Sequence, residues 1–444
     1  MTNAEMRQKC LSPFLEQEAL YKERICPNIE KYRKGDFRLR LTDRDGKPLA
    51  GVTVEVRQET HDFKYGANIF MLDEFPTDAE NAAYRALFHR YFNLATVPFY
   101  WDGIEPKEGH PRYAADSEKV ARRPAPDLCM DYCREHGIAP KLHCLFYDKW
   151  IPSWLPKTDA DAMRRLYEKR FGEIAARYKD ALYEVEVVNE MLEEQYWKTQ
   201  SVLCAEKDIV EWAFALARKH FPQSKLVFNE GCRVPFIAAA DYRDPYILML
   251  DRAIAHGASV DKIGIQNHIF CGATCPQEED IDDKLRWMDP VKQIKAMDVL
   301  SSFGKPLEIT EVTVPTVGTG DEAEALQAEI LKNLYTLWFS VPQMETIVYW
   351  NTVEGTAWNA PNGAWRENDC RGGLFRRDFT PKPAAKMLRH LFREQWCTRL
   401  TVKTDENGCV DLRGFYGDYT AAANGTPFTF GIHRGDAIGK TVIL

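Results

Sequence analysis

Two glutamates end apolar segments that are typical of buried strands. Glu190 closes YEVEVVNE (183–190), and Glu311 closes KPLEITE (305–311). Two carboxyl groups held about 5–5.5 Å apart can cleave a glycosidic bond with retention, because one protonates the leaving oxygen and the other attacks the anomeric carbon. Taken singly, either glutamate could instead form a salt bridge or cap a following helix. The pair at matched strand ends favours the two-carboxyl chemistry.

The elements that must position these glutamates follow a repeating pattern. Apolar segments alternate with helical stretches such as 161–178 and 322–339, and this alternation predicts a closed parallel (β/α)8 barrel, the TIM-barrel fold of the α/β class. Active sites of such barrels lie at the carboxyl ends of the strands, and strands four and seven face each other across the mouth. The eight predicted strand segments are 64–70, 94–101, 139–147, 184–190, 225–230, 261–269, 305–311 and 346–351.

Polar and aromatic side chains gather at the same strand ends. Polar groups that converge on one mouth are costly to desolvate unless they bind something. Aromatic rings can stack on the C–H faces of sugars, although core packing is an equally good explanation for any single tryptophan. The predicted substrate-binding residues are His143, Asn189, Gln266, His268, Trp101, Tyr147, Trp350 and Trp358.

The two ends of the chain differ in texture from the barrel region. Residues 1–35 have loosely helical spacing and predict an N-terminal helical segment. Residues 36–60 and 397–444 contain short strand-like runs between turn signals. Because small sheets are marginal in water, we expect the two ends to join in one accessory β-sandwich beside a catalytic barrel at 61–396. A brace for the barrel or an oligomer contact is a more plausible role for it than carbohydrate binding.

Composition excludes several classes of partner. The chain of 444 residues has a net charge of −8 and no basic stripe, so we expect no nucleic acid partner. There is neither a signal-like apolar segment near the first residues nor a run of about 18 apolar residues, so we expect no membrane association. Twelve cysteines without a signal are typical of reduced thiols and predict a cytoplasmic protein; oligomerisation stays possible.

Cysteine and acidic clusters add little to this prediction. HIFCGATC (268–275) and CMDYC (129–133) lack the paired spacing of a zinc site, so neither a metal nor another cofactor is expected. The acidic run PQEEDIDDK (276–284) is interpreted as a solvated loop.

Six motifs in the same order resemble glycoside hydrolase family 10, the retaining β-xylanases, over about residues 61–396. They are LHCLFYDKWIPSW (142–154), VVNE (187–190), Gln266 with His268, ITE (309–311), WNTVEGTAW (350–358) and FTPKPA (379–384). The resemblance implies that Glu190 is the acid/base and Glu311 the nucleophile. It also implies that His143 contacts the sugar at the cleavage site and that Asn189 contacts the 2-hydroxyl of that sugar. His268 would form a hydrogen bond with the nucleophile.

The sequence departs from this family where the second strand ends. The family reads F-N-x-x-T-P-E-N-E-M-K-W-D there, whereas this chain reads FNLATVPFYWD (92–102) and lacks the Glu, Asn and Lys that grip the next sugar. Thr313 replaces an aspartate that would orient the histidine. We therefore expect the chemistry to be kept and the sugar contacts to be rebuilt.

Three functions stay open on this basis. The first is hydrolysis of β-1,4-linked xylo-oligosaccharides or xylan fragments. The second is hydrolysis of another β-glycoside, such as a β-glucoside of a plant metabolite. The third is sugar binding without catalysis, against which the intact pair of glutamates argues.

Overall fold

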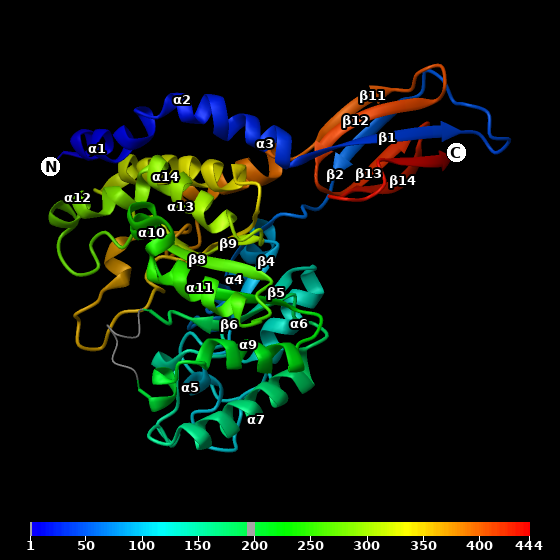
Figure 1. Cartoon of the computed structure of the whole chain (residues 1–444). Coiled ribbons are helices and arrows are strands. Elements are labelled where there is room, and N and C mark those ends of the chain that lie inside the picture. Colours follow the sequence, from blue (N-terminus) through cyan, green and yellow to red (C-terminus); the bar gives the residue numbers. More distant parts are fainter. Residues whose placement is uncertain (1, 193–199) are drawn as a thin grey trace.

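Eight parallel strands close into a barrel, as the sequence predicted (Figure 1). The computed structural model describes residues 2–192 and 200–444. The strand order around the barrel is β10-β3-β4-β5-β6-β7-β8-β9, so neighbours along the chain are neighbours in space. The strands are β3 (Lys64–Asn68), β4 (Leu94–Pro98), β5 (Ala139–His143), β6 (Glu184–Asn189), β7 (Lys225–Glu230), β8 (Lys262–His268), β9 (Leu307–Thr313) and β10 (Met344–Tyr349).

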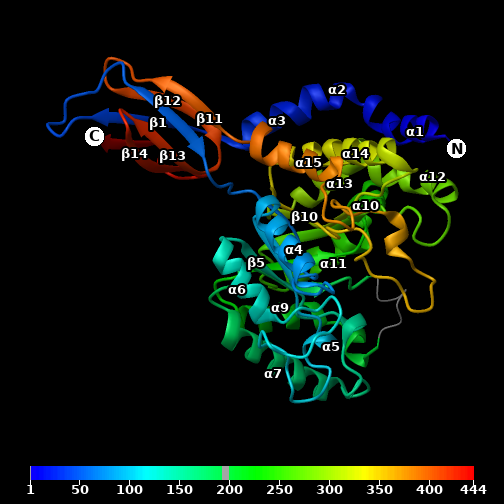
Figure 2. The ribbon, with the colours of Figure 1, turned by 180° about the vertical axis from the view of Figure 1, so that it is seen from behind.

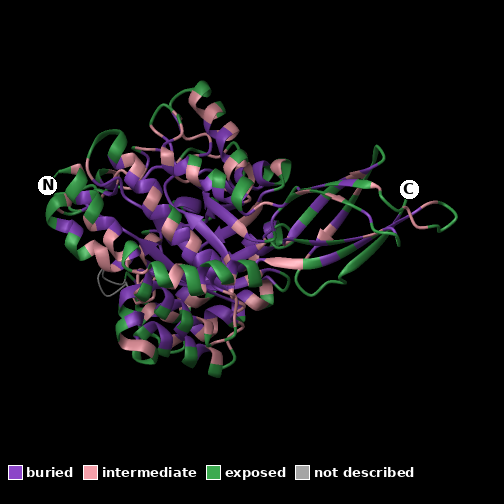
Figure 3. Cartoon of the chain, turned by 90° about the horizontal axis from the view of Figure 1, so that it is seen from above, coloured by how far each residue is buried: buried purple, intermediate pink, exposed green. Residues whose placement is uncertain are grey.

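Helices cover the outside of the barrel and bury its strands, while their own outer faces are exposed (Figure 3). The local sequence determines where several of these helices begin. Thr77, for example, caps α4 and forms a reciprocal capping box with Glu80. The helices are α4 (Asp78–Tyr91), α5 (Trp101–Ile104), α6 (Pro126–His136), α7 (Ala160–Tyr178), α9 (Ile209–His220), α10 (Val234–Ala240), α11 (Pro245–Ala255), α12 (Gln277–Met288), α13 (Pro290–Ser301), α14 (Gly320–Ser340) and α15 (Pro383–His390). Short helical turns include η2 (Asp148–Trp150), η3 (Val202–Ala205), η4 (Asp241–Arg243), η5 (Glu367–Cys370) and η6 (Leu391–Gln395).

The interpretation of residues 276–284 as a solvated loop was wrong, because they open helix α12. Glu278, Glu279 and Asp280 occupy its first turn, where negative charge is favourable beside the positive end of the helix dipole. Ile281 and Met288 bury the opposite face. Across residues 2–192 and 200–444, none of the helices combines the length and apolar character that a bilayer-crossing helix needs.

The first residues of the chain are helical and run along α14 (Figure 1). The elements are α1 (Asn3–Leu15), α2 (Glu18–Leu20), η1 (Tyr21–Ile25) and α3 (Cys26–Tyr32). Met6, Cys10 and Phe14 are buried on one face of α1, and Arg7 forms an ion pair of 2.6 Å with Glu329 of α14. This segment therefore covers the outer face of a barrel helix.

Two antiparallel-rich sheets stand to one side of the barrel, beyond α3 (Figure 2). They combine strands from both ends of the chain and bury a common apolar core that includes Leu39, Val54 and Phe430. One sheet has the order β12-β1-β15, and the other β11-β2-β13-β14. Their strands are β1 (Lys34–Thr42), β2 (Thr53–Gln58), β11 (Arg399–Lys403), β12 (Cys409–Phe415), β13 (Gly417–Ala423), β14 (Thr426–Ile432) and β15 (Gly439–Ile443).

Charged side chains fill the lower interior of the barrel. The ammonium nitrogen of Lys141 lies 2.6 Å from Glu186 and 2.5 Å from Glu308, and that of Lys262 contacts Glu184; all five side chains are buried. Burial opposes the charged form of Lys141, but Glu186 and Glu308 outweigh it and raise its pKa. Burial and the charge of Glu184 raise the pKa of Glu308 to about 7. The cluster of three acids and two lysines can therefore hold one further proton.

We expect Lys262→Met to lower the free energy of unfolding by about 3–5 kcal/mol, because it leaves Glu184 buried without its cation. Urea unfolding followed by tryptophan fluorescence measures this difference. Lys169→Met, which removes an exposed partner of Glu173 on α7, serves as the matched control and should change the value by about 0.5 kcal/mol or less. Equal unfolding midpoints for the Lys262 variant and the wild type would contradict a stabilising role for the cluster.

Candidate active site

Gln266 holds the two predicted catalytic glutamates together at the mouth of the barrel. Its side-chain nitrogen donates to Oε1 of Glu190 and to Oε1 of Glu311, at 2.9 Å in each case. The two oxygens therefore cannot be farther apart than twice that distance, about 5.8 Å. Carboxyl groups of inverting glycosidases are about 6.5–9.5 Å apart, and those of retaining ones about 5–5.5 Å. The separation fits the retaining geometry.

Glu190 follows the last residue of β6 with a backbone φ of 54°, in the left-handed region. Non-glycine residues adopt this region at a cost in energy and do so preferentially at functional sites. The Tyr147 hydroxyl donates to Oε2 of Glu190. Burial and the charge of Glu190 raise the pKa of Tyr147 well above its usual range, so this hydroxyl keeps its proton and remains a donor.

Glu311 lies inside β9 and is almost completely buried. Burial raises the pKa of its carboxyl, the charges of Glu190 and Glu186 add to the effect, and His143 opposes it. Nε2 of His268 lies 3.1 Å from Oε2 of Glu311. Glu311 thus retains a proton more readily than an isolated carboxyl group does.

His268 is held in one orientation by Thr313, the residue that stands in place of the expected aspartate. Nδ1 of His268 lies 2.8 Å from the Thr313 hydroxyl. Burial lowers the pKa of His268 to about 4, against the charges of Glu367 and Glu190, so the ring is neutral at neutral pH. A neutral ring has one N–H. When Glu311 is ionised, as attack on a sugar requires, its carboxylate can only accept, so Nε2 then carries the hydrogen and Nδ1 accepts from Thr313.

A chain of buried amides adjoins Glu311. Asn229 donates to Oδ1 of Asn189 at 2.7 Å and accepts from the Thr310 hydroxyl at 2.6 Å. The side-chain nitrogen of Asn189 is buried without a hydrogen-bond partner in the described part of the chain. Gly264 makes room for this chain, because a Cβ there would lie 2.6 Å from Thr310 and 3.0 Å from Asn229.

His143 connects the mouth of the barrel to its charged interior. Nε2 lies 2.9 Å from the Tyr100 hydroxyl, and Nδ1 contacts Glu186 of the lysine cluster. Burial alone would lower the pKa of His143, but the Glu186 carboxylate raises it above its usual value. His143 therefore tends to carry a positive charge close to Glu311.

A cavity of about 490 Å³ contains both glutamates. Of the residues predicted from the sequence, it is lined by His143, Tyr147, Glu190, Gln266, His268, Glu311, Trp350 and Trp358. The ring of Trp350 lies 5.3 Å from that of His143, between centroids. Asn189 is buried beneath this surface and reaches the site through Asn229 and Glu311. These nine residues, from β5, β6, β8, β9 and the loops after β5 and β10, come together.

Trp101 is the exception, and the structure corrects its assignment. β4 ends at Pro98, and Trp101 begins α5, so its ring turns into the core instead of the mouth. It packs edge-on against Trp154 and Tyr167 and donates to Glu105 at 3.0 Å. Trp101 does not line the cavity. It has a packing role.

Sequence reasoning missed other residues of the cavity wall. Arg122 and Arg123 reach it from the loop before α6, and Glu367 reaches it from η5. These loop segments have no hydrophobic periodicity, so their sequence contains no signal for the direction of their side chains. Phe270 could have been found, because it follows β8 by two residues and stacks on His268 at 4.4 Å between centroids. Within the described residues, no group of three or more His, Cys, Asp or Glu is arranged to hold a metal ion.

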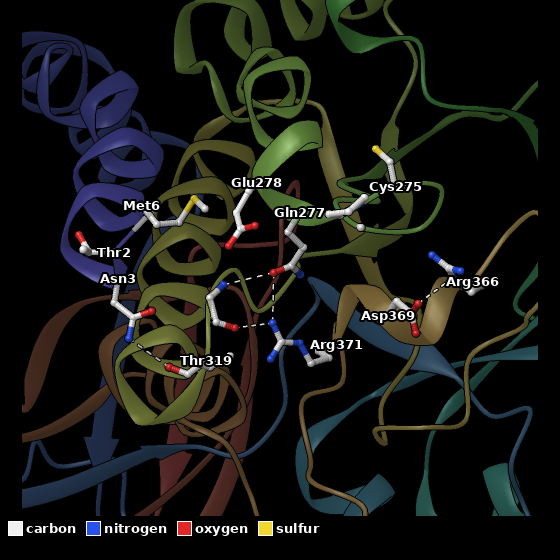
Figure 4. A pocket seen from close by; sticks show the side chains of 13 residues that line it. Thr2, Asn3, Met6, Cys275, Gln277, Glu278, Thr319, Arg366, Asp369 and Arg371 are labelled. Atoms are coloured by element: carbon white, nitrogen blue, oxygen red, sulfur yellow. Dashed lines mark hydrogen bonds and ion pairs between the residues drawn. The ribbon is translucent and has the colours of Figure 1, made fainter.

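A second cavity, of about 340 Å³, lies between α1, the start of α12 and the residues in and around η5 (Figure 4). Gln277 bonds both Gly318 and Arg371, and Asn3 donates to Thr319 at 3.2 Å. Arg366 pairs with Asp369 at 2.8 Å. These contacts join the residue after η5 to the start of α12, and α1 to the residues before α14; Glu190 and Glu311 do not line this cavity.

Comparison with known proteins places this arrangement in a family. The model for glycosyl hydrolase family 10 matches residues 63–391, about three quarters of the chain. The chain belongs to glycosyl hydrolase family 10. The family expected from the six sequence motifs is thereby confirmed.

Relatives of this family 10 chain include proteins with different names. It is 25% identical over 422 residues to anti-sigma-I factor RsgI6 of Acetivibrio thermocellus, covering 93% of this chain and 48% of that protein. It is 24% identical over 401 residues to endo-1,4-beta-xylanase 2 of Arabidopsis thaliana, covering 87% of this chain and 32% of that one. The chain thus spans half or less of the length of these relatives.

Solved structures support the fold. Native xylanase 10B from Thermotoga maritima superposes with a TM-score of 0.58 at 17% identity, over 75% of this chain and 96% of that one. Xylanase 10B from Thermotoga petrophila RKU-1, in complex with xylobiose, gives a TM-score of 0.58 at 18% identity, over 75% and 95%. At this level of identity the likeness establishes the shared barrel architecture.

We expect Thr313→Asp to raise the pKa of His268 from about 4 by one unit or more, because a carboxylate at Nδ1 stabilises the imidazolium. Titration of the histidine ring signals by NMR measures this. Thr313→Val, an uncharged control with nearly the shape of threonine, should leave the pKa of His268 low. A His268 that titrates at the same pH in the Asp variant as in the wild type would show that Thr313 does not govern its charge.

Proposed function

We propose that the protein is a retaining β-glycoside hydrolase that cleaves β-1,4-linked xylo-oligosaccharides or xylan fragments. The observation that carries the proposal is the pair of carboxyl groups bridged by Gln266 within about 5.8 Å. Membership of glycosyl hydrolase family 10, and relatives named as xylanases, support the reaction class and the sugar.

In the first step, Glu190 donates its proton to the glycosidic oxygen as the bond to the anomeric carbon breaks. Oε2 or Oε1 of Glu311 attacks that carbon from the opposite face and forms a glycosyl ester. In the second step, Glu190 removes a proton from water, the water oxygen attacks the anomeric carbon, and Glu311 leaves as a carboxylate. The two inversions give a product with the original β configuration.

The residues around the two glutamates influence the protonation of these carboxyl groups during both steps. The reaction needs one proton on Glu190 and an ionised Glu311. Burial raises the pKa of Glu311, whereas His143, whose own pKa is raised by Glu186, and the N–H of His268 favour the ionised form of Glu311 that attack requires. The free N–H of Asn189 can donate to the sugar 2-hydroxyl, a bond that strengthens as charge develops on the ring.

The wall beside β4 favours a second candidate, hydrolysis of a different β-glycoside such as a β-glucoside. Where the family carries amide, carboxyl and ammonium groups, this chain presents Pro98, Phe99 and Tyr100. Only Tyr100 of these three lines the cavity, and its hydroxyl bonds His143. Sugar binding without catalysis is the remaining alternative, and the geometry of the two glutamates argues against it.

We expect Glu311→Ala to lose at least about 10⁴-fold in kcat, because no other group can form the glycosyl ester. Azide should restore turnover of an activated aryl glycoside and give an α-configured glycosyl azide, identified by proton NMR. Glu190→Ala should retain partial activity on aryl glycosides with good leaving groups and lose activity on unactivated oligosaccharides. Full hydrolysis of an unactivated oligosaccharide by this variant would refute the role of Glu190.

We expect an aryl β-xyloside to be hydrolysed with a higher kcat/KM than the matching aryl β-glucoside, and xylo-oligosaccharides to yield shorter β-anomers at the start of the reaction. Steady-state kinetics and early NMR spectra of the products measure both. A preference for the glucoside would select the second candidate. Thermal stabilisation by xylo-oligosaccharides with no turnover of either glycoside would select sugar binding alone.

A further inference from the structure

Two consecutive arginines, Arg122 and Arg123, lie on the cavity wall beside His143. The guanidinium carbon of Arg123 lies 3.9 Å from the centroid of the Tyr100 ring and 5.4 Å from that of Trp150. Tyr100 in turn bonds His143 at 2.9 Å. The two cations therefore share one cavity with Glu190 and Glu311 but take no part in the proposed bond cleavage.

The side chains of both arginines bond neutral oxygens in the part of the chain that the structure describes. Arg122 donates to the amide oxygen of Asn351 at 3.3 Å, and Arg123 donates to the backbone oxygen of Arg122 at 3.0 Å. The Nε of Arg122 is buried without a hydrogen-bond partner. By contrast, Arg233 on the same cavity surface pairs with Asp244 at 2.6 Å.

The acids closest to the two arginines do not neutralise them by direct contact. Asn351 donates to Glu367 at 2.5 Å and so stands between that carboxylate and Arg122. Burial lowers the pKa of both guanidinium groups, which reflects the energetic penalty of holding them away from water. Both side chains are half-buried, and a cation that is partly removed from water without a paired anion carries a desolvation cost. A ligand that brings an anion relieves this penalty.

The backbone that carries the arginines is built to hold them in place. Arg122 has a φ of 61°, in the left-handed region, which non-glycine residues adopt mainly where the surroundings enforce it. Arg112 donates to the backbone oxygens of Gly103 at 2.5 Å and of Arg123 at 3.3–3.4 Å. A Cβ at Gly103 would lie 2.9 Å from Cγ of Arg123, so the glycine leaves a channel for that side chain.

We propose that Arg122 and Arg123 bind the carboxylate of an acidic sugar unit, a uronate, in the substrate. The inference rests on the proposed glycosidase function, because the cations lie in the cavity of the two glutamates and the anion must arrive with the sugar. Guanidinium groups match the planar, two-oxygen geometry of a carboxylate. Tyr100 and Trp150 supply the adjoining aromatic surface for the ring that carries it.

The test compares a uronate-bearing xylo-oligosaccharide with its methyl ester, which has nearly the same shape and no charge. We expect the wild type to hydrolyse the acid with a kcat/KM about 10–100-fold above that of the ester, as one charge-assisted contact allows. Arg123→Met should bring this ratio close to one, and Arg123→Lys should retain part of the preference. Arg233→Met, whose cation is paired with Asp244, is the matched control and should keep the wild-type ratio.

Several outcomes separate this inference from the proposed function. Equal rates for acid and ester in the wild type overturn the carboxylate site while leaving glycoside hydrolysis intact. A ratio lowered equally by Arg233→Met also overturns it. If no oligosaccharide is turned over, the glycosidase proposal fails, and calorimetric titration of the acid and the ester into Glu311→Ala still decides whether the cavity prefers the anion.

Discussion

The mutual repulsion of Glu190 and Glu311 is the constraint around which the site is arranged. Two carboxylates no more than about 5.8 Å apart repel by at least about 3 kcal/mol at an effective dielectric constant of 20. One amide group, that of Gln266, donates to both and so lowers this penalty without introducing a charge. The amide reaches them because β8 and β9 shift register between Ile265 and Gln266, which sets Gln266 opposite Glu311. The irregularity in the ladder is therefore part of the site.

The charged side chains in the barrel interior continue this set of electrostatic contacts below the mouth. Lys141 and Lys262 form ion pairs with three buried glutamates, and Glu186 of that set bonds His143. The other ring nitrogen of His143, Nε2, lies 2.9 Å from the Tyr100 hydroxyl. The orientation and charge of a residue at the mouth thus depend on ion pairs in the barrel interior, and these pairs in turn need the closed wall of strands that excludes water.

The sequence predicted those parts of the site that lie on strands. In a strand the direction of each side chain follows from its position, so Gln266, His268 and Glu311 could be placed from the pattern of the segments alone. Trp101 was misplaced because the chain leaves β4 at Pro98 and begins a helix, which redirects the ring. Helix α12 was missed because its acidic residues obscured the buried Ile281 and Met288. The direction of Arg122 depends on a left-handed backbone and on contacts with distant residues, which no local pattern encodes.

In the proposed function, the bond cleavage and the choice of substrate are carried by different walls of this barrel. The groups that handle protons and the glycosyl ester come from β6, β8 and β9, where amides, a neutral histidine and the glutamates bond one another directly. A change in any one of these alters the charge of the others. In the described residues, Tyr100 after β4 contacts this network through its hydroxyl, which bonds His143, and through its ring, which lies 6.2 Å from that of Tyr147 between centroids. The hydrogen bonds among Gln266, His268 and the two glutamates involve no residue of the Arg122 loop, so that loop can change while these bonds stay in place.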